Sequence, residues 1–252
     1  REKKYTKIVR INKNTGSREY LFNYEGTITD YFDGYSDFII DSTGVIWITD
    51  NKEKVLYACD PETELKYAFT YDSLQNLLGC GKINISGMAA YSKGNVWFNS
   101  TYGKILKFYQ GKFTVYTIES EDNSLNGLSA DAENYLWFKG GKNKIYKFDG
   151  SSLKSYPLDP DLDDKDLRLV SLESDKEGGI WYSFYEFIQV VNDKYYGLYR
   201  MKDGEYQKWK LDNYFLYDTL ITNIFCDSRG RIWFYSKGIW YIENGVIGRL
   251  NL

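Results

Sequence analysis

The stretch Asp227-Ser228-Arg229-Gly230-Arg231-Ile232-Trp233-Phe234 decides the fold, because the same pattern occurs four more times upstream. The earlier copies occupy residues 41–48, 91–98, 131–138 and 175–182. Four of the five copies begin with Asp, and four carry Gly three residues later. The tryptophans of successive copies are 40 to 52 residues apart, a period typical of architectures that place one structural unit beside the next. The sequence therefore predicts a repeat protein.

Each copy lies within a predicted set of four short strands. In the first full repeat these strands are 36–40, 45–49, 55–59 and 66–70. The second strand is apolar at three consecutive positions, as in Ile46-Trp47-Ile48, which requires both of its faces to be buried. Four strands in about 46 residues are typical of one β-propeller blade, which is sandwiched between two neighbours. We therefore predict an all-β fold, a β-propeller of four-stranded blades.

The repeated Asp, Gly and Trp are predicted to be structural. Asp at the start of the turn between the first two strands can accept backbone N–H bonds, and Gly three residues later allows a positive φ. Asn134, which replaces Gly in one copy, tolerates the same conformation. The structural positions are Asp41, Gly44, Trp47, Gly94, Trp97, Asp131, Trp137, Asp175, Gly178, Trp181, Asp227, Gly230 and Trp233. Hairpin turns between third and fourth strands are expected at Gln110-Gly111, Asp149-Gly150, Asp203-Gly204 and Asn244-Gly245.

The N-terminal region matches only the second half of a repeat. Two strands are predicted, Lys7–Ile11 and Arg18–Phe22, which make residues 1–33 a partial blade before five full blades in 34–252. The chain is thus predicted to be a single propeller domain, cut from a longer protein. It could be a six-position ring with one partial blade, a five-bladed ring with an extra hairpin, or an arc of a larger ring. Six positions are favoured, because a ring leaves few exposed strand edges.

Composition excludes several kinds of chemistry. The 252 residues include no histidine, which excludes Ser-His-Asp and Cys-His catalysis and histidine-ligated zinc. Three widely spaced cysteines, Cys59, Cys80 and Cys226, are expected to be buried free thiols. A net charge of −3 without a basic patch argues against nucleic acid and anionic membranes as partners. No cofactor and no metal are expected.

Function in a propeller is expected in its variable links. Links from second to third strands, and from one blade to the next, lie on the same face and carry function on a rigid scaffold. The segment from Tyr71 to Ile85 is unusually long and contains several leucines. It is expected to be a loop tucked over the mouth of the central channel, since apolar clusters lie under long loops.

A candidate ligand-binding surface follows Trp181. The link after this strand is expanded into a predicted hairpin arm over residues 184–191, and the next inter-blade link is rich in aromatic and acidic residues. Aromatic rings mixed with carboxylates at a concave surface suit a sugar or a peptide. Alternatively, these side chains pack together to cover an exposed blade edge. The candidate ligand-binding residues are Tyr185, Glu186, Phe187, Asp212, Tyr214 and Tyr217.

An acidic stretch from Asp159 to Asp166 begins like a calcium loop, with carboxylates at alternate positions. It lacks glycine at the sixth position and has Val170 where a calcium loop carries its bidentate Glu. A solvated turn is the favoured interpretation, and a weak cation site is the alternative.

Two segments resemble the tandem repeat of the two-component regulator propellers, the extracytoplasmic sensor regions of bacterial hybrid histidine kinases. One runs from Asn123-Ser124-Leu125 through Asp131 to Leu136-Trp137-Phe138, and the other runs from Thr219 to Trp233. Tyr91 departs from the family's turn pattern, because it stands where the turn Asp is expected.

The resemblance implies a sensor module, in the periplasm or at the cell surface, that binds a glycan fragment or another small molecule and transmits a conformational signal. A homodimer or a neighbouring propeller domain is the further partner expected. Two other classes stay open. One is a propeller enzyme, a lyase or glycoside hydrolase working without imidazole, for which no catalytic residue is assigned. The other is a surface interaction scaffold.

Overall fold

The computed structural model describes residues 6–11, 14–24, 38–63, 65–90, 94–100, 103–119, 125–141, 143–162, 165–188, 194–209 and 220–250. These residues form five antiparallel four-stranded sheets and one separate hairpin. Within each four-stranded sheet, neighbouring strands are consecutive in the sequence. We name the sheets blades 1 to 5 in chain order.

The strands have the following bounds. Blade 1 contains β3 (Phe38–Ile40), β4 (Ile46–Asp50), β5 (Val55–Cys59) and β6 (Lys66–Thr70). Blade 2 contains β7 (Ile85–Ala90), β8 (Val96–Ser100), β9 (Lys104–Tyr109) and β10 (Lys112–Thr117). Blade 3 contains β11 (Leu125–Ala130), β12 (Leu136–Gly140), β13 (Lys144–Phe148) and β14 (Leu153–Pro157). Blade 4 contains β15 (Leu167–Ser174), β16 (Ile180–Glu186), β17 (Lys194–Lys202) and β18 (Glu205–Trp209), and blade 5 contains β19 (Thr222–Cys226), β20 (Ile232–Tyr235), β21 (Ile239–Glu243) and β22 (Val246–Arg249).

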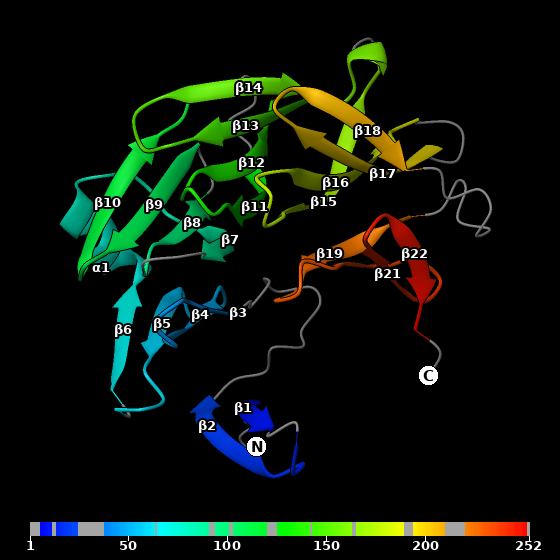
Figure 1. The fold of residues 1–252 in the computed structure, drawn as a ribbon. Coiled ribbons are helices and arrows are strands. Elements are labelled where there is room, and N and C mark those ends of the chain that lie inside the picture. The colour runs from blue at the N-terminus through cyan, green and yellow to red at the C-terminus, as the bar shows by residue number, and fades with distance from the viewer. Residues whose placement is uncertain are drawn as a thin grey trace.

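The blades fan around a common centre with their first strands innermost (Figure 1). Strand β3 packs beside β7, β7 beside β11, β11 beside β15, and β15 beside β19. The fold is a β-propeller, as the repeat predicted. No helix within the described ranges is long and apolar enough to cross a membrane.

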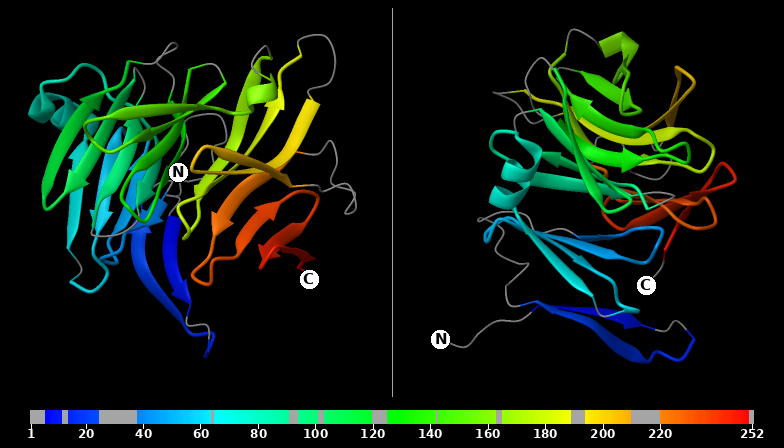
Figure 2. Two further views of the ribbon diagram at one scale, coloured as in Figure 1. Left: turned by 45° about the horizontal axis from the view of Figure 1, so that its top comes forward. Right: turned by 90° about the vertical axis from the view of Figure 1, so that its left-hand side faces the viewer.

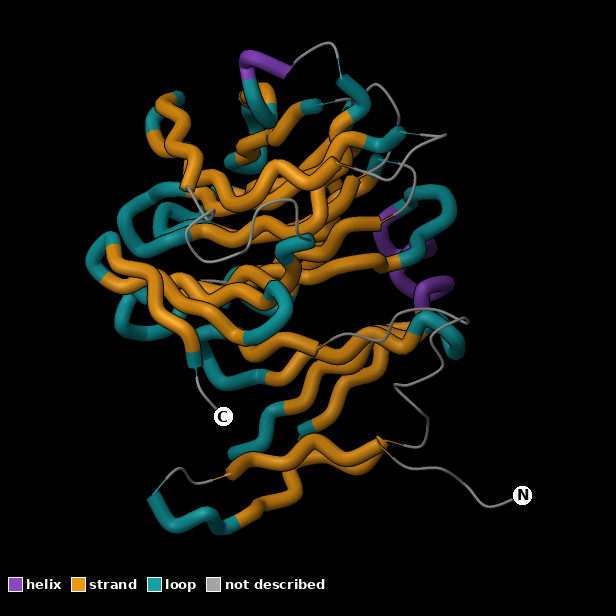
Figure 3. Tube along the Cα trace, turned by 90° about the vertical axis from the view of Figure 1, so that its right-hand side faces the viewer, coloured by secondary structure: helices purple, strands orange, loops and turns teal. Residues whose placement is uncertain are grey.

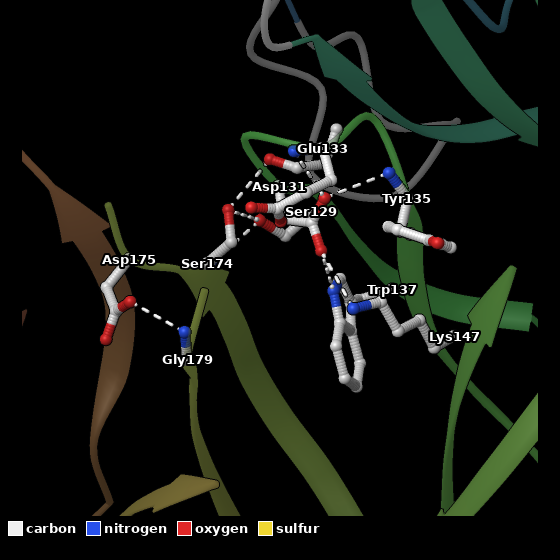
Figure 4. A network of polar contacts seen from close by, with 10 residues as sticks. Ser129, Asp131, Glu133, Tyr135, Trp137, Lys147, Ser174, Asp175 and Gly179 are labelled. Atoms are coloured by element: carbon white, nitrogen blue, oxygen red, sulfur yellow. Dashed lines mark hydrogen bonds and ion pairs between the residues drawn. The ribbon is translucent and has the colours of Figure 1, made fainter. Parts of the chain in front are cut away.

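The acidic turn forms in the way its residues predicted, with one addition. Asp131 Oδ1 accepts the backbone N–H groups of Glu133 at 3.1 Å and Tyr135 at 2.9 Å, and Asn134 has a φ of 67°. The other carboxylate oxygen accepts the indole N–H of Trp137 at 2.8 Å (Figure 4). The turn Asp of blades 1, 4 and 5 makes the same set of bonds. The repeated Asp therefore fixes both the turn and the tryptophan ring.

Blade 2, which has Tyr91 in place of Asp, offers a natural comparison. Trp97 is fully buried, yet its indole nitrogen has no hydrogen-bond partner. We expect Trp97→Phe to cost only the packing lost with the smaller ring, because no hydrogen bond is lost. Trp137→Phe should cost about 1–2 kcal/mol more, because it leaves a buried carboxylate oxygen short of a donor. Urea unfolding of the two variants measures the difference, and equal losses would contradict a stabilising role of the Asp–Trp bond.

The hydrophobic core lies between blades. The second strands of blades 1 and 2 are buried along their whole length, and Trp47 packs edge-on against Phe98 and Phe108 of blade 2 at 5.5 and 4.7 Å. The tryptophans of blades 2, 3 and 4 likewise belong to clusters shared with the next blade. Burial on both faces of the Trp strand thus follows from the stacking of blades, as predicted.

The segment after β6 is a helix, α1 (Tyr71–Leu78), and the expectation of a loop over the channel mouth was wrong. Thr70 caps its N-terminus by accepting the backbone N–H of Ser73, and Gly79 ends it with a φ of 59°. The helix contacts the outer strands β6 and β10 rather than the channel. Its buried side chains, Tyr71 and Leu74, fill the space between blades 1 and 2. The apolar residues that suggested a loop therefore include the apolar face of a short helix.

Three of the four predicted hairpin turns have two residues. Gln110, Asp203 and Asn244 each have positive φ and precede a glycine that also does, which is the backbone of a type I′ turn. The fourth is a longer link, residues 149–152, in which Asp149 accepts the backbone N–H groups of Ser151 and Ser152 at 2.7 Å. Its two serines offer the donors that make a longer Asx-type turn favourable.

The N-terminal residues form the expected hairpin, β1 (Thr6–Ile11) and β2 (Arg18–Tyr24). It lies beside blade 1, on the side away from blade 2 (Figures 2 and 3). A short 3₁₀ helix, η1 (Pro160–Leu162), connects blades 3 and 4.

Candidate functional site

A cavity of about 490 Å³ occupies the central channel, where the inner strands lead into the acidic turns. All five inner strands contribute to its wall. The side chains in this wall include Phe38, Ile40, Ser129, Glu173, Phe225 and Cys226. A concave site shared by several elements of a rigid scaffold is the usual place for a small ligand.

Strand register explains why one carboxyl group stands in this wall. In every blade the inner-strand residue that pairs with the tryptophan occupies the same position. These residues are Ile39, Ala89, Ser129, Glu173 and Phe225. Of these five, Glu173 alone is ionisable.

Glu173 is held between blades 3 and 5. Its Oε2 accepts the hydroxyl of Ser129 at 3.2 Å, and its Oε1 accepts the backbone N–H of Cys226 at 3.4 Å. Burial raises the pKa of Glu173 to about 7, although the bonds from Cys226 and Ser129 act in the opposite direction. Near neutral pH this carboxyl group therefore exchanges between an acceptor-only anion and a neutral group that can also donate.

Ser129 links the carboxyl group to the neighbouring blade. Its hydroxyl accepts the backbone N–H of Ser174 at 2.8 Å, and the Ser174 hydroxyl donates to the carbonyl of Ala130 at 2.8 Å. Figure 4 shows the two serines facing each other across the junction of blades 3 and 4. A change in the protonation or hydrogen bonding of Glu173 therefore acts directly on the bonds that join blades 3, 4 and 5.

Asp175, only two residues from Glu173, has the opposite electrostatic setting. Arg200 Nε donates to Asp175 Oδ2 at 2.7 Å and the same guanidinium bonds Glu177 at 2.7 Å. Burial alone would raise the pKa of Asp175, but the bonds from Arg200, Gly179 and the turn tryptophan lower it. Asp175 thus stays ionised in its structural role, and Glu173 is the carboxyl group available for chemistry or binding.

The sequence-predicted candidates lie at the other end of β16. The ring of Tyr185 is 5.8 Å from that of Tyr195. Glu186 accepts the hydroxyl of Tyr196 at 2.8 Å and lies 3.8 Å from the ammonium of Lys165. Tyr185 pairs with Tyr195 and Glu186 pairs with Lys194 in the elongated β16–β17 hairpin, so the predicted arm is confirmed as far as Glu186.

The remaining candidates divide into two groups. Phe187 is 37% exposed, with the guanidinium of Arg168 4.6 Å from its ring centre. Asp212, Tyr214 and Tyr217 lie outside the described residues, so whether they meet Phe187 stays a prediction.

Two described aspartates of the acidic stretch after blade 3 bond other side chains. Asp159 Oδ2 accepts the hydroxyl of Tyr199 at 3.0 Å, and Asp166 pairs with Arg168 at 3.3 Å. In the part of the chain that the structure describes, no group of three or more Cys, Asp or Glu side chains could hold a metal ion. All three cysteines are free thiols, of which only Cys59 is fully buried.

Sequence reasoning missed Glu173 because it followed the variable links. The signal was present in the aligned repeats. Two residues before the turn, the copies have Ile, Ala, Ser, Glu and Phe. A single carboxyl group at a position that is otherwise apolar or small is the kind of exception that marks a site.

No protein-family model and no curated protein matches the chain. Solved structures do match it. Virginiamycin B lyase from Staphylococcus aureus superposes with a TM-score of 0.67 at 16% identity, over 98% of this chain and 77% of the lyase. Hydrazine synthase from Kuenenia stuttgartiensis gives 0.64 at 10% identity, over 93% of this chain and 70% of the synthase.

An extracellular domain of a two-component system is also among the similar structures. The extracellular domain of the hybrid two-component system BT4673 from B. thetaiotaomicron gives a TM-score of 0.53 at 14% identity. The match covers 87% of this chain and 33% of that domain. At such identities these likenesses establish the shared fold, and the function has to be argued from the site.

Proposed function

We propose that this chain is a ligand-binding sensor module of a two-component signalling protein of the regulator-propeller type, working in the periplasm or at the cell surface. Its ligand is a glycan fragment or a similar small molecule rich in hydroxyl groups, bound in the channel cavity. The observation that carries the proposal is Glu173, a partly buried carboxyl group in the wall of that cavity. The similar fold of the BT4673 extracellular domain supports the signalling context.

The chemistry of the cavity suits such a ligand. Glu173 and the hydroxyl of Ser129 can exchange hydrogen bonds with sugar hydroxyls. Phe38 and Phe225, which are 48% and 58% exposed, offer flat apolar faces on which a sugar ring can stack. Because Glu173 also bonds the backbone of blade 5, a ligand that takes over its carboxyl group alters the contact between blades, which is a route for a signal.

An enzyme is the second candidate, and one observation favours it. A carboxyl group with a pKa of about 7 is suited to general acid–base catalysis. One structure similar to this chain is a virginiamycin B lyase described as catalytically inactive with a histidine replaced by alanine. This chain has no histidine, so an activity of this kind would need a different acid or base.

Calorimetry of the chain against a panel of neutral and acidic oligosaccharides tests the proposal. We expect saturable binding without turnover, and Glu173→Gln should weaken it at least about tenfold because one hydrogen-bond acceptor is exchanged for a donor. Tyr185→Ala is the matched control on the other face and should bind normally.

The other outcomes are separable. Loss in Tyr185→Ala with normal binding by Glu173→Gln would move the site to the loop face. New reducing ends or unsaturated sugars would establish an enzyme. No binding and no turnover across the panel would contradict the proposal and favour a scaffold.

A further inference from the structure

One face of blade 5 is partly exposed, although the equivalent face of each other blade is buried against the next blade. In blades 1 to 4 the repeated tryptophan packs against the next blade and is at most 5% exposed. Trp233, its equivalent in blade 5, is less completely buried, and Tyr235, two residues further along β20, is 52% exposed. Among the residues that the structure describes, the interface used four times within this chain is thus open on its fifth copy.

The position two residues after the tryptophan shows the same difference. Asn99 of blade 2 donates its amide N–H to the carbonyl of Leu125 in blade 3 at 2.7 Å. Ser183 of blade 4 donates to the carbonyl of Ile221, just before β19, also at 2.7 Å. Tyr235 holds this position in blade 5, where its large exposed side chain faces the place of a following blade.

Apolar side chains bound this place on both sides. On β3 of blade 1, Phe38 and Ile40 are 48% and 57% exposed, whereas Ile39 between them packs toward blade 2. On β19 of blade 5, Phe225 is 58% exposed. Exposed apolar groups of this size gathered at one location mark an interaction surface.

The outer half of a blade is already present there. The sequence of β1 and β2 matches the third and fourth strands of a repeat, and Figure 1 shows this hairpin outside the ring, beside blade 1. A third strand without a second strand has a free edge of backbone N–H and C=O groups. Among the described residues, no strands form the inner half of this blade, which would cover the surface and pair with the free edge of β1.

We propose that the place between blades 5 and 1 binds an antiparallel pair of strands with the pattern of this chain's own repeat: an inner strand, an acidic turn and a tryptophan strand. One face of the pair would cover Trp233 and Tyr235, and the other would face Phe38 and Ile40. The tryptophan strand would pair with β1, an addition to a sheet edge in which main-chain bonds give affinity and side-chain fit gives specificity. Phe38 and Phe225 also line the channel cavity, so a bound strand pair and a channel ligand would share these two side chains.

A synthetic peptide of residues 220–235, the inner half of blade 5, is the probe. Added to the full chain under reducing conditions, it should bind with saturation, raise the melting temperature and shift tryptophan emission to the blue. Tyr235→Arg should weaken binding at least about tenfold by placing a charge in the interface. Leu77→Asp, at a 70% exposed site on α1, is the matched control and should bind normally.

Three results would overturn the proposal. The first is a monomeric chain that does not bind the peptide. The second is equal binding of a peptide with both Ile232 and Trp233 replaced by Asp. The third is a dimer, seen by sedimentation, that Tyr235→Arg dissociates, because a second copy would then be the occupant.

Discussion

Asp131→Ala is expected to lower the free energy of unfolding by about 3 kcal/mol. The side chain of Asp131 is fully buried and lies 3.5 Å from the ammonium of Lys147. It also accepts two backbone N–H groups and the indole of Trp137. Alanine removes all of these acceptors at once and leaves a buried indole donor and a cation without their partner. Urea unfolding monitored by tryptophan fluorescence measures the loss.

The same chain supplies a control for this prediction. Asp227→Ala removes an equivalent set of bonds in blade 5, but the side chain of Asp227 is 15% exposed. Water can replace part of what is lost, so the decrease should be smaller. Equal losses at the two positions would show that the bonds contribute to the same extent whether or not the carboxylate is buried, and the expected effect of burial would then be wrong.

Glu173→Gln is expected to stabilise the protein above neutral pH, by about 2 kcal/mol after allowing for partial exposure. The pKa of Glu173 is raised from 4.5 to about 7 in the folded state, so the folded chain holds this proton where the unfolded chain releases it. Between about pH 4.5 and pH 7 the contribution of this group to stability therefore falls as the pH rises, and above pH 7 the penalty is complete. Glutamine, which stays neutral, has no such penalty.

Unfolding free energies measured from about pH 5 to pH 8.5 test this expectation. The curves of the native chain and of Glu173→Gln should lie close together at the acid end and separate as the pH rises. Glu205→Gln, an exposed position on blade 4, should follow the native curve. Parallel curves for the native chain and Glu173→Gln would mean that the carboxyl group is not buried enough to matter. If Glu173→Gln is stable, a loss of ligand binding in this variant cannot be attributed to unfolding.

The sequence allowed the blades to be predicted because their signal is local and repeated. The predicted strands 55–59 and 66–70 match β5 and β6 at both ends. The turn aspartates bond the backbone as expected, but the bond to the indole could not be predicted, because it depends on the rotamers of two side chains packed in three dimensions. Helix α1 was missed even though Thr70, Leu74 and Gly79 carry ordinary helix signals, since the repeat frame left that segment to a loop.

The candidate site was less predictable. Tyr185 and Glu186 were chosen because copies of the repeat differ most in length there. The cavity lies where the copies agree in length and differ in the side chain at one inner-strand position. The sequence shows that residue 173 is a glutamate. Its burial and its bonds to Ser129 and Cys226 depend on residues from three different blades. Only the arrangement of the inner strands around one centre brings them together.

The order of strands within each blade also bears on how such a chain can change in evolution. Since every four-stranded sheet is built from consecutive strands, a blade can be duplicated or deleted as one continuous piece of sequence without rethreading the rest. The tryptophan and its aspartate are six residues apart, so each new copy brings its own anchor with it. Contacts of such short sequence separation also favour rapid folding of each piece.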